Sequence, residues 1–174
     1  STINDTLPFY TGDPLDMIGQ RLASIKGLLN SQWPDGSWRF DGDALLNNGE
    51  PASTLGPDEA SELGISASRA LQVLHYARLT GDETIAAAGI RALENMATFE
   101  VPRAAQVWEI PVHSPDILAS GRAIRAFLEG YKITGRQDFL NEAVYWARTA
   151  LPFVYTWGAS EHDWMRYGSI PVFG

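Results

Sequence analysis

Apolar residues recur at helical spacing along most of this chain, and no segment shows a convincing alternation typical of a strand. Asp13 and Pro14 are typical of a helix start, because aspartate is a good N-cap and proline is favoured at the first helical position. Ile18 and Leu22 then begin an apolar stripe that continues to Leu29. We therefore predict a first helix from Pro14 to about Leu29.

A second and a third helix are predicted on either side of Gly81. The second covers residues 64–79, and Gly81 suits a left-handed C-terminal cap. Asp82 can cap the third helix, whose pattern fades by Val101. The apolar stripes expected to be buried are Ala67, Ala70, Leu71, Leu74 and Ala77 in the second helix and Ile85, Ala88, Ala92, Leu93 and Met96 in the third.

A fourth and a fifth helix follow in the same manner. Ser114 as a cap and Pro115 at the first position predict the start of the fourth, which ends at Gly135. The fifth is predicted over about 137–155, with Pro152 bending or ending it. The stripes expected to be buried are Ile117, Gly121, Ile124, Leu128 and Tyr131 in the fourth helix and Leu140, Ala143, Val144, Ala147 and Leu151 in the fifth.

The helix pairs form an internal repeat. The segment LQVLHYARLTGDETI (71–85) resembles AFLEGYKITGRQDF (126–139) at an offset of about 54 residues. Long connectors at 32–57, 101–115 and 156–169 alternate with short ones, and antiparallel helices joined in this way place every long connector at one end. The expected fold is therefore all-α, built from antiparallel helix hairpins with the long loops on one face.

The first long connector contains a recognisable motif. Gln32, Gly36 and Trp38 match the pattern Gln-x-x-x-Gly-x-Trp, which resembles the QW motif of terpene cyclases and related α/α toroids. The hairpin repeat is also similar to that superfamily, which includes six-hairpin glycoside hydrolases and many polysaccharide lyases. In the motif, the glutamine closes exposed helix-end groups and the indole stacks over it. A full toroid has six hairpins and this chain has about two and a half, so the resemblance implies an incomplete toroid.

The resemblance does not extend to every enzyme of that architecture. Cyclases of the protonating class use an Asp-x-Asp-Asp motif, which the run from Asp41 to Ala44 does not complete. Protein prenyltransferases have a cysteine in their zinc site, and this chain has no cysteine. The resemblance therefore favours carbohydrate chemistry over terpene cyclisation or prenyl transfer.

The composition of the chain argues against several classes of protein. The 174 residues suit one domain, residues 1–174, and no apolar stretch is long enough to span a membrane. A formal charge of −8 and singly scattered Lys and Arg argue against a nucleic-acid partner. The three histidines lack metal-type spacing, so neither a metal nor another cofactor is expected. The N-terminal segment lacks the order of a signal peptide, and the compartment stays open.

The loop carboxylates are the candidates for catalysis, because glycoside hydrolysis commonly needs one carboxyl group that donates a proton and another that is ionised. Glu109 beside Trp108 is the best placed to be desolvated and to act as general acid. Its alternative is to cap the fourth helix or to pair with Arg103 or Arg122. Asp35 is the candidate base, and its alternative is a turn residue in an Asp-Gly dipeptide.

Aromatic and polar loop residues complete the predicted site. Tryptophan faces can stack on sugar rings, although Trp38 can instead plug the end of the bundle. The run 161–164 combines two acids with a histidine and a tryptophan, of which at most two can face one ligand. The predicted catalytic residues are Glu109, Asp35 and Glu161, and the predicted substrate-binding residues are Trp38, Trp108, His113, His162, Asp163 and Trp164.

Three functions are consistent with these features. The leading hypothesis is a carbohydrate-active protein with a saccharide partner, either a glycoside hydrolase or a polysaccharide lyase. The alternative is a non-catalytic binding or interaction module, because an incomplete toroid has open flanks that favour a homo-oligomer or docking to a missing second half. A terpene-cyclase-like protein is the third.

Overall fold

The computed structural model describes residues 14–104 and 110–153. These residues contain no strand and only two isolated bridges, Leu45 to Pro51 and Arg103 to Pro115. The all-α prediction is therefore confirmed. The helices are α2 (Pro14–Asn30), α3 (Leu63–Thr80), α4 (Glu83–Met96), α5 (Ile117–Thr134) and α6 (Gln137–Ala150), with 3-10 turns η1 (Ala52–Leu55) and η2 (Leu151–Phe153).

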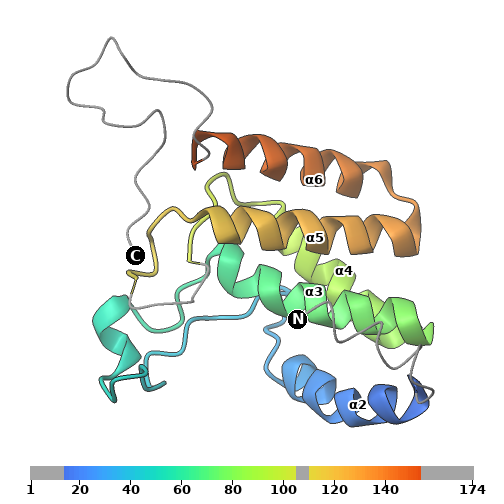
Figure 1. Ribbon diagram of the computed structural model, residues 1–174, viewed down its shortest axis with the longest axis horizontal. Helices are drawn as coiled ribbons and strands as arrows, with labels where there is room; N and C mark the ends of the chain where they lie inside the picture. The colour runs from blue at the N-terminus through green and yellow to red at the C-terminus, as the bar shows by residue number, and fades with distance from the viewer. Residues whose placement is uncertain (1–13, 105–109, 154–174) are drawn as a thin grey trace.

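The helices form a repeat-like arrangement around α3 and α5 (Figure 1). Among the described helices, α3 packs most extensively against α5, while α4 packs on α3 and α6 packs on α5. Helix α2 lies against α3. The short connectors 81–82 and 135–136 lie at one end of the helices, opposite the long connectors (Figure 1). A toroid remains a prediction.

The short connectors end and restart helices as predicted. Gly81 has a φ of 72°, and its N–H donates to the carbonyl of Ala77 at 2.8 Å. Gly135 has a φ of 70° and repeats this arrangement in the second pair. Asp82 then accepts a hydrogen bond from the N–H of Ile85, which satisfies one of the free donors at the start of α4.

Helix α5 begins later than predicted. Ser114 was expected as its N-cap, but the helix starts at Ile117 and the cap is Asp116. The carboxylate of Asp116 accepts a hydrogen bond from the N–H of Leu118 at 2.7 Å. Pro115 instead forms the bridge with Arg103, so this segment belongs to the connector.

The most deeply buried residues of α5 are not those of the predicted stripe, whose Ile124, Leu128 and Tyr131 pack against the core but are only partly buried. The large residues of that stripe are partly exposed, whereas small residues such as Ala123 and Ala126 are fully buried. Gly130 shows why small residues are needed, because a Cβ added there would lie 2.2 Å from Leu93 of α4. The buried face of α5 therefore combines a large aromatic residue, Phe127, with small residues where neighbouring helices approach closely.

Helix α6 ends before Tyr155, and its predicted stripe is only partly correct. Pro152 lies in the 3-10 turn that follows Ala150, so the expectation that it ends the helix is confirmed. Val144 is 44% exposed, while Trp146 is fully buried. An aromatic side chain buries more apolar area than a valine, and this determines the rotation of α6.

The motif in the first connector attaches it to α4. The amide nitrogen of Gln32 donates to the carbonyls of Gly36 and Ala88, both at 3.0 Å. Gly36 has a φ of 86°, and a Cβ there would lie 2.4 Å from the carbonyl oxygen of Arg91. Both the backbone conformation and the space at this position therefore require glycine.

Replacing Gly36 with alanine is expected to destabilise the protein more than the matched change Gly49→Ala. Gly49 has a φ of 85° but open space around it, so Gly49→Ala measures backbone strain alone, about 1–2 kcal/mol. Gly36→Ala adds the clash with Arg91, for about 1–3 kcal/mol more. Urea denaturation measures both variants, and equal losses would contradict the close packing of this connector on α4.

Candidate functional site

The first two long connectors meet at one end of the helices (Figure 1). The N–H of Val112 donates to the carbonyl of Leu55, and the N–H of Gly64 donates to the carbonyl of Arg103, both at 2.9 Å. For these two connectors, the predicted shared end is confirmed. The third predicted connector, 156–169, lies outside the described residues.

Trp38 is part of the interior at this end. Its side chain is 1% exposed, and its indole nitrogen donates to the carbonyl of Leu28 in the last turn of α2 at 2.9 Å. Its backbone N–H donates to the hydroxyl of Ser66. An enclosed ring offers no face to a sugar, so this geometry favours the structural role of Trp38 over stacking on a substrate.

Asp35 has the contacts of a turn residue. Its carboxylate accepts hydrogen bonds from the hydroxyl and the N–H of Ser37, at 2.6 and 3.0 Å, and pairs with Arg39 at 2.5 Å. The hydroxyl of Ser37 contributes most to lowering the pKa of Asp35 below its ordinary value. A carboxylate that is already stabilised in its charged form is a weak base, so the geometry favours the turn role.

His113 lies beside a carboxylate that sequence reasoning missed. Its Nδ1 is 2.7 Å from Oε1 of Glu62, the residue before α3. The Glu62 side chain is 11% exposed and that of His113 is 59% exposed, so a buried acid holds an exposed imidazole. The guanidinium of Arg103 donates to the backbone carbonyl of His113 and holds the segment in place. Glu62 is 51 residues from His113 in the sequence, and no motif or spacing links the two residues.

The following predicted site residues lie outside the described part of the chain: Glu109, Trp108, Glu161, His162, Asp163 and Trp164. Their roles stay predictions.

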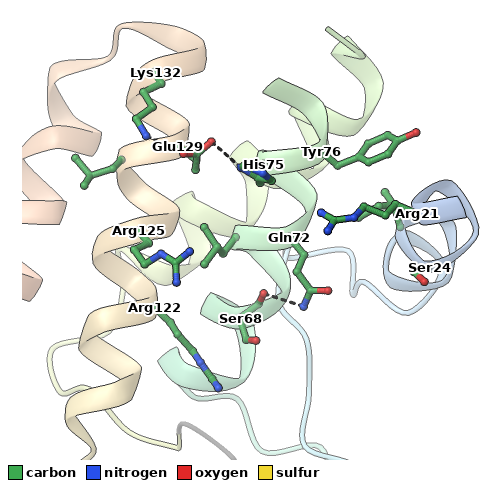
Figure 2. A pocket seen from close by; sticks show the side chains of 13 residues that line it. Arg21, Ser24, Ser68, Gln72, His75, Tyr76, Arg122, Arg125, Glu129 and Lys132 are labelled. Carbon is green, nitrogen blue, oxygen red and sulfur yellow. Dashed lines mark hydrogen bonds and ion pairs between the residues drawn. The ribbon is translucent and has the colours of Figure 1, made fainter. Parts of the chain in front are cut away.

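A groove lies between α2, α3 and α5 (Figure 2). Its volume is about 670 Å³, within the range of small-molecule sites. Four of its lining residues are cationic: Arg21, Arg122, Arg125 and Lys132. The expectation that the cations are scattered is therefore wrong for this face.

The sequence contained a signal for this groove. Arg122, Arg125, Glu129 and Lys132 follow intervals of three, four and three residues, which place them on one face of a helix. The contribution of α2, about 100 residues earlier, has no such signal.

Among the described residues that line the groove, Glu129 is the one acid, and it is paired with cations. Arg78 of α3 donates to it at 2.5 Å and Lys132 at 2.8 Å, while Nδ1 of His75 is 3.6 Å away. Burial alone raises the pKa of Glu129, but the hydrogen bonds and charges of Lys132 and Arg78 outweigh burial and lower it. Glu129 therefore stays ionised and ties α5 to α3.

The residues that the structure describes contain no cluster of three or more metal-binding side chains. None of the described helices is long and apolar enough to cross a membrane. No protein-family model, curated protein or solved structure matches the chain.

The substitution Glu129→Gln is expected to destabilise the protein by about 1–3 kcal/mol at pH 7, towards the lower end because Arg78 and Lys132 are partly exposed. The pKa of Glu129 is lowered by folding, so its stabilisation is present above the unfolded-state pKa and is lost as the pH falls through the folded-state pKa. The difference in unfolding free energy between wild type and variant should therefore shrink below about pH 4.3.

The matched control is Glu94→Gln, which removes an ion pair to Arg136 between two largely exposed side chains. It is expected to cost much less than Glu129→Gln. A Glu129→Gln difference that is independent of pH, measured by urea denaturation, would contradict the assigned ion pairs.

Proposed function

We propose that this chain is a carbohydrate-active protein, a glycoside hydrolase or a polysaccharide lyase, that performs acid–base chemistry at the end where the long connectors meet. The observation that supports this proposal is the pair formed by buried Glu62 and exposed His113, whose Oε1 and Nδ1 are 2.7 Å apart.

The pair has the arrangement that general base catalysis needs. Glu62 occupies Nδ1 of the imidazole, so Nε2 is the nitrogen that exchanges a proton with a bound molecule. A positioned general base or acid increases the rate of a reaction by about 10²–10⁴. Glu62 is a positioning residue in this proposal, and His113 is the group that contacts substrate.

Hydrolysis and elimination each require one base and one acid. In hydrolysis a base takes a proton from water as the oxygen attacks the anomeric carbon, and an acid protonates the leaving oxygen. In elimination the base takes a proton from carbon, a C=C bond forms, and the leaving oxygen again receives a proton. We assign the base to His113 and keep Glu109, four residues earlier, as the proposed acid.

The test is turnover of a panel of neutral and acidic polysaccharides, followed by released reducing ends and by unsaturated products. We expect His113→Gln to lower kcat/KM by about 10²–10⁴ with unchanged thermal unfolding. Glu62→Gln should lower it in the same direction, because the imidazole loses its charged partner. Glu109→Gln should also lose activity.

Glu50→Gln is the control, since Glu50 is an exposed acid in the first long connector. It should change kcat/KM by less than about twofold, as expected for a surface residue outside the site. Activity of His113→Gln equal to that of wild type would contradict the assigned base. No turnover of any polysaccharide would contradict the enzyme class.

The groove between α2, α3 and α5 favours one alternative function, a non-catalytic binding module. It is a possible ligand site whose lining does not include Glu62 or His113. Saccharide binding in isothermal titration calorimetry without any turnover would select that alternative. The charged lining of the groove does not resemble the hydrocarbon pocket that a terpene-cyclase-like protein needs.

A further inference from the structure

Helix α6 and the turn after it carry an apolar stripe that is exposed in the part of the chain that the structure describes. The intervals of four, three and four residues place the following side chains on one face: Leu140, Val144, Ala147 and Leu151. Leu140 is partly exposed and Ala147 is exposed, while Val144 and Leu151 are 44% and 55% exposed. Leu151 keeps helical dihedral angles, with φ −57° and ψ −39°. Contiguous exposed apolar surface is typical of an interaction site.

The internal repeat shows what covers the equivalent stripe on α4. At the offset of about 54 residues, Ile90 and Leu93 of α4 correspond to Val144 and Ala147 of α6. Leu93 is fully buried, and a Cβ on Gly130 of α5 would lie 2.2 Å from it, so α5 covers this face of α4. Figure 1 shows α6 at the edge of the helices, where its other neighbour is missing on the side away from α3.

The sequence of the stripe suits a second copy of the same chain. The intervals read the same from either end, so two antiparallel α6 helices oppose apolar residues along the whole stripe. In that arrangement Leu140 of one copy lies opposite Leu151 of the other, and Val144 lies opposite Ala147. The short side chain of Ala147 leaves room for the valine, whereas the equivalent residue on α4 is the larger Leu93, which packs on α5.

The polar residues beside the stripe favour the antiparallel direction. Asn141 and Arg148 directly follow Leu140 and Ala147, so they lie along the same border of the stripe. A parallel pair would bring the two Arg148 side chains together, whereas an antiparallel pair separates them and brings each one towards Asn141 of the other copy. The helix dipoles also oppose a parallel pair and favour an antiparallel one.

We propose that two copies of this chain associate through this stripe, with their α6 helices antiparallel. The stripe is much smaller than a standard interface, which has about 20–30 residues a side. The formal charge of −8 on each copy also opposes association. We therefore expect a weak dimer with a Kd of about 0.1 mM, so that the chain is a monomer at the micromolar concentrations used in unfolding experiments.

The first test is sedimentation equilibrium of the whole chain between about 10 µM and 1 mM, a range that brackets the expected Kd. The mass should rise from that of a monomer towards that of a dimer. Added salt should strengthen association, because it screens the repulsion between two acidic copies.

Val144→Glu should weaken association by about tenfold or more, because it places a charge in an apolar contact. Val144 is exposed in the monomer, so the variant should fold. The control Leu45→Glu adds the same charge at a residue that is 72% exposed in the first long connector, outside the stripe. It should change the Kd by less than about twofold.

Disulfide formation tests the antiparallel direction, since the chain has no cysteine of its own. Val144→Cys and Ala147→Cys are made as separate variants, and each is oxidised alone and in an equal mixture. Opposed residues of an antiparallel pair bring their Cβ atoms within the roughly 4 Å that a disulfide needs. The mixture should therefore give cross-linked dimers faster than either variant alone.

Three results would overturn the proposal. The first is a monomer at every concentration, and the second is an equal loss of association in Val144→Glu and Leu45→Glu. The third is faster cross-linking of each single variant alone than of the mixture, which would show a parallel pair. None of these measurements depends on enzymatic activity, so the proposal stands or falls separately from the proposed function.

Discussion

The packing of α3 against α5 is the constraint on which the other features of this structure depend. Each of the two helices begins just after a long connector, so their packing brings Glu62 next to His113. The same two helices form walls of the cationic groove, and the ion pair between Arg78 and Glu129 joins them there. One helix–helix contact therefore positions both candidate sites.

Small residues are common on the buried faces of these helices. Fully buried alanines occur on both helices, including Ala67 on α3 and Ala126 on α5. A Cβ on Gly89 of α4 would lie 2.5 Å from Leu74 of α3, so α4 also packs closely on α3 at this position. Short side chains let helix axes approach closely, which increases dispersion contacts without requiring large apolar residues.

The local features of the fold could be predicted from the sequence, and the long-range features could not. Gly81, Asp82 and Gly135 act through neighbours within four residues, so their roles as caps follow from residue type. The inner face of α5 depends instead on which helices surround it. Ile124 and Leu128 of the predicted stripe pack against the core but are only partly buried, while Ala123, Ala126 and Phe127 are fully buried. Burial is a property of the assembled fold rather than of a single helix.

The same distinction between local and long-range contacts applies to the candidate sites. The turn role of Asp35 follows from the Asp-Gly dipeptide, because its partners are two and four residues away. Glu62 and His113 are 51 residues apart, and no periodic pattern links them. Arg21 and Arg125 are farther apart still, and they share a groove because α2 and α5 both flank α3. Pairing of distant side chains requires the topology to be known first.

The unfolding free energy of the Ala126→Leu variant tests the central role of close helix packing most directly. Ala126 is fully buried, so a leucine there is expected to cost about 1–3 kcal/mol in urea denaturation through overpacking. The matched change Ala147→Leu, at an exposed position on α6, should leave stability within about 0.5 kcal/mol of wild type. An Ala126→Leu protein as stable as Ala147→Leu would contradict the account.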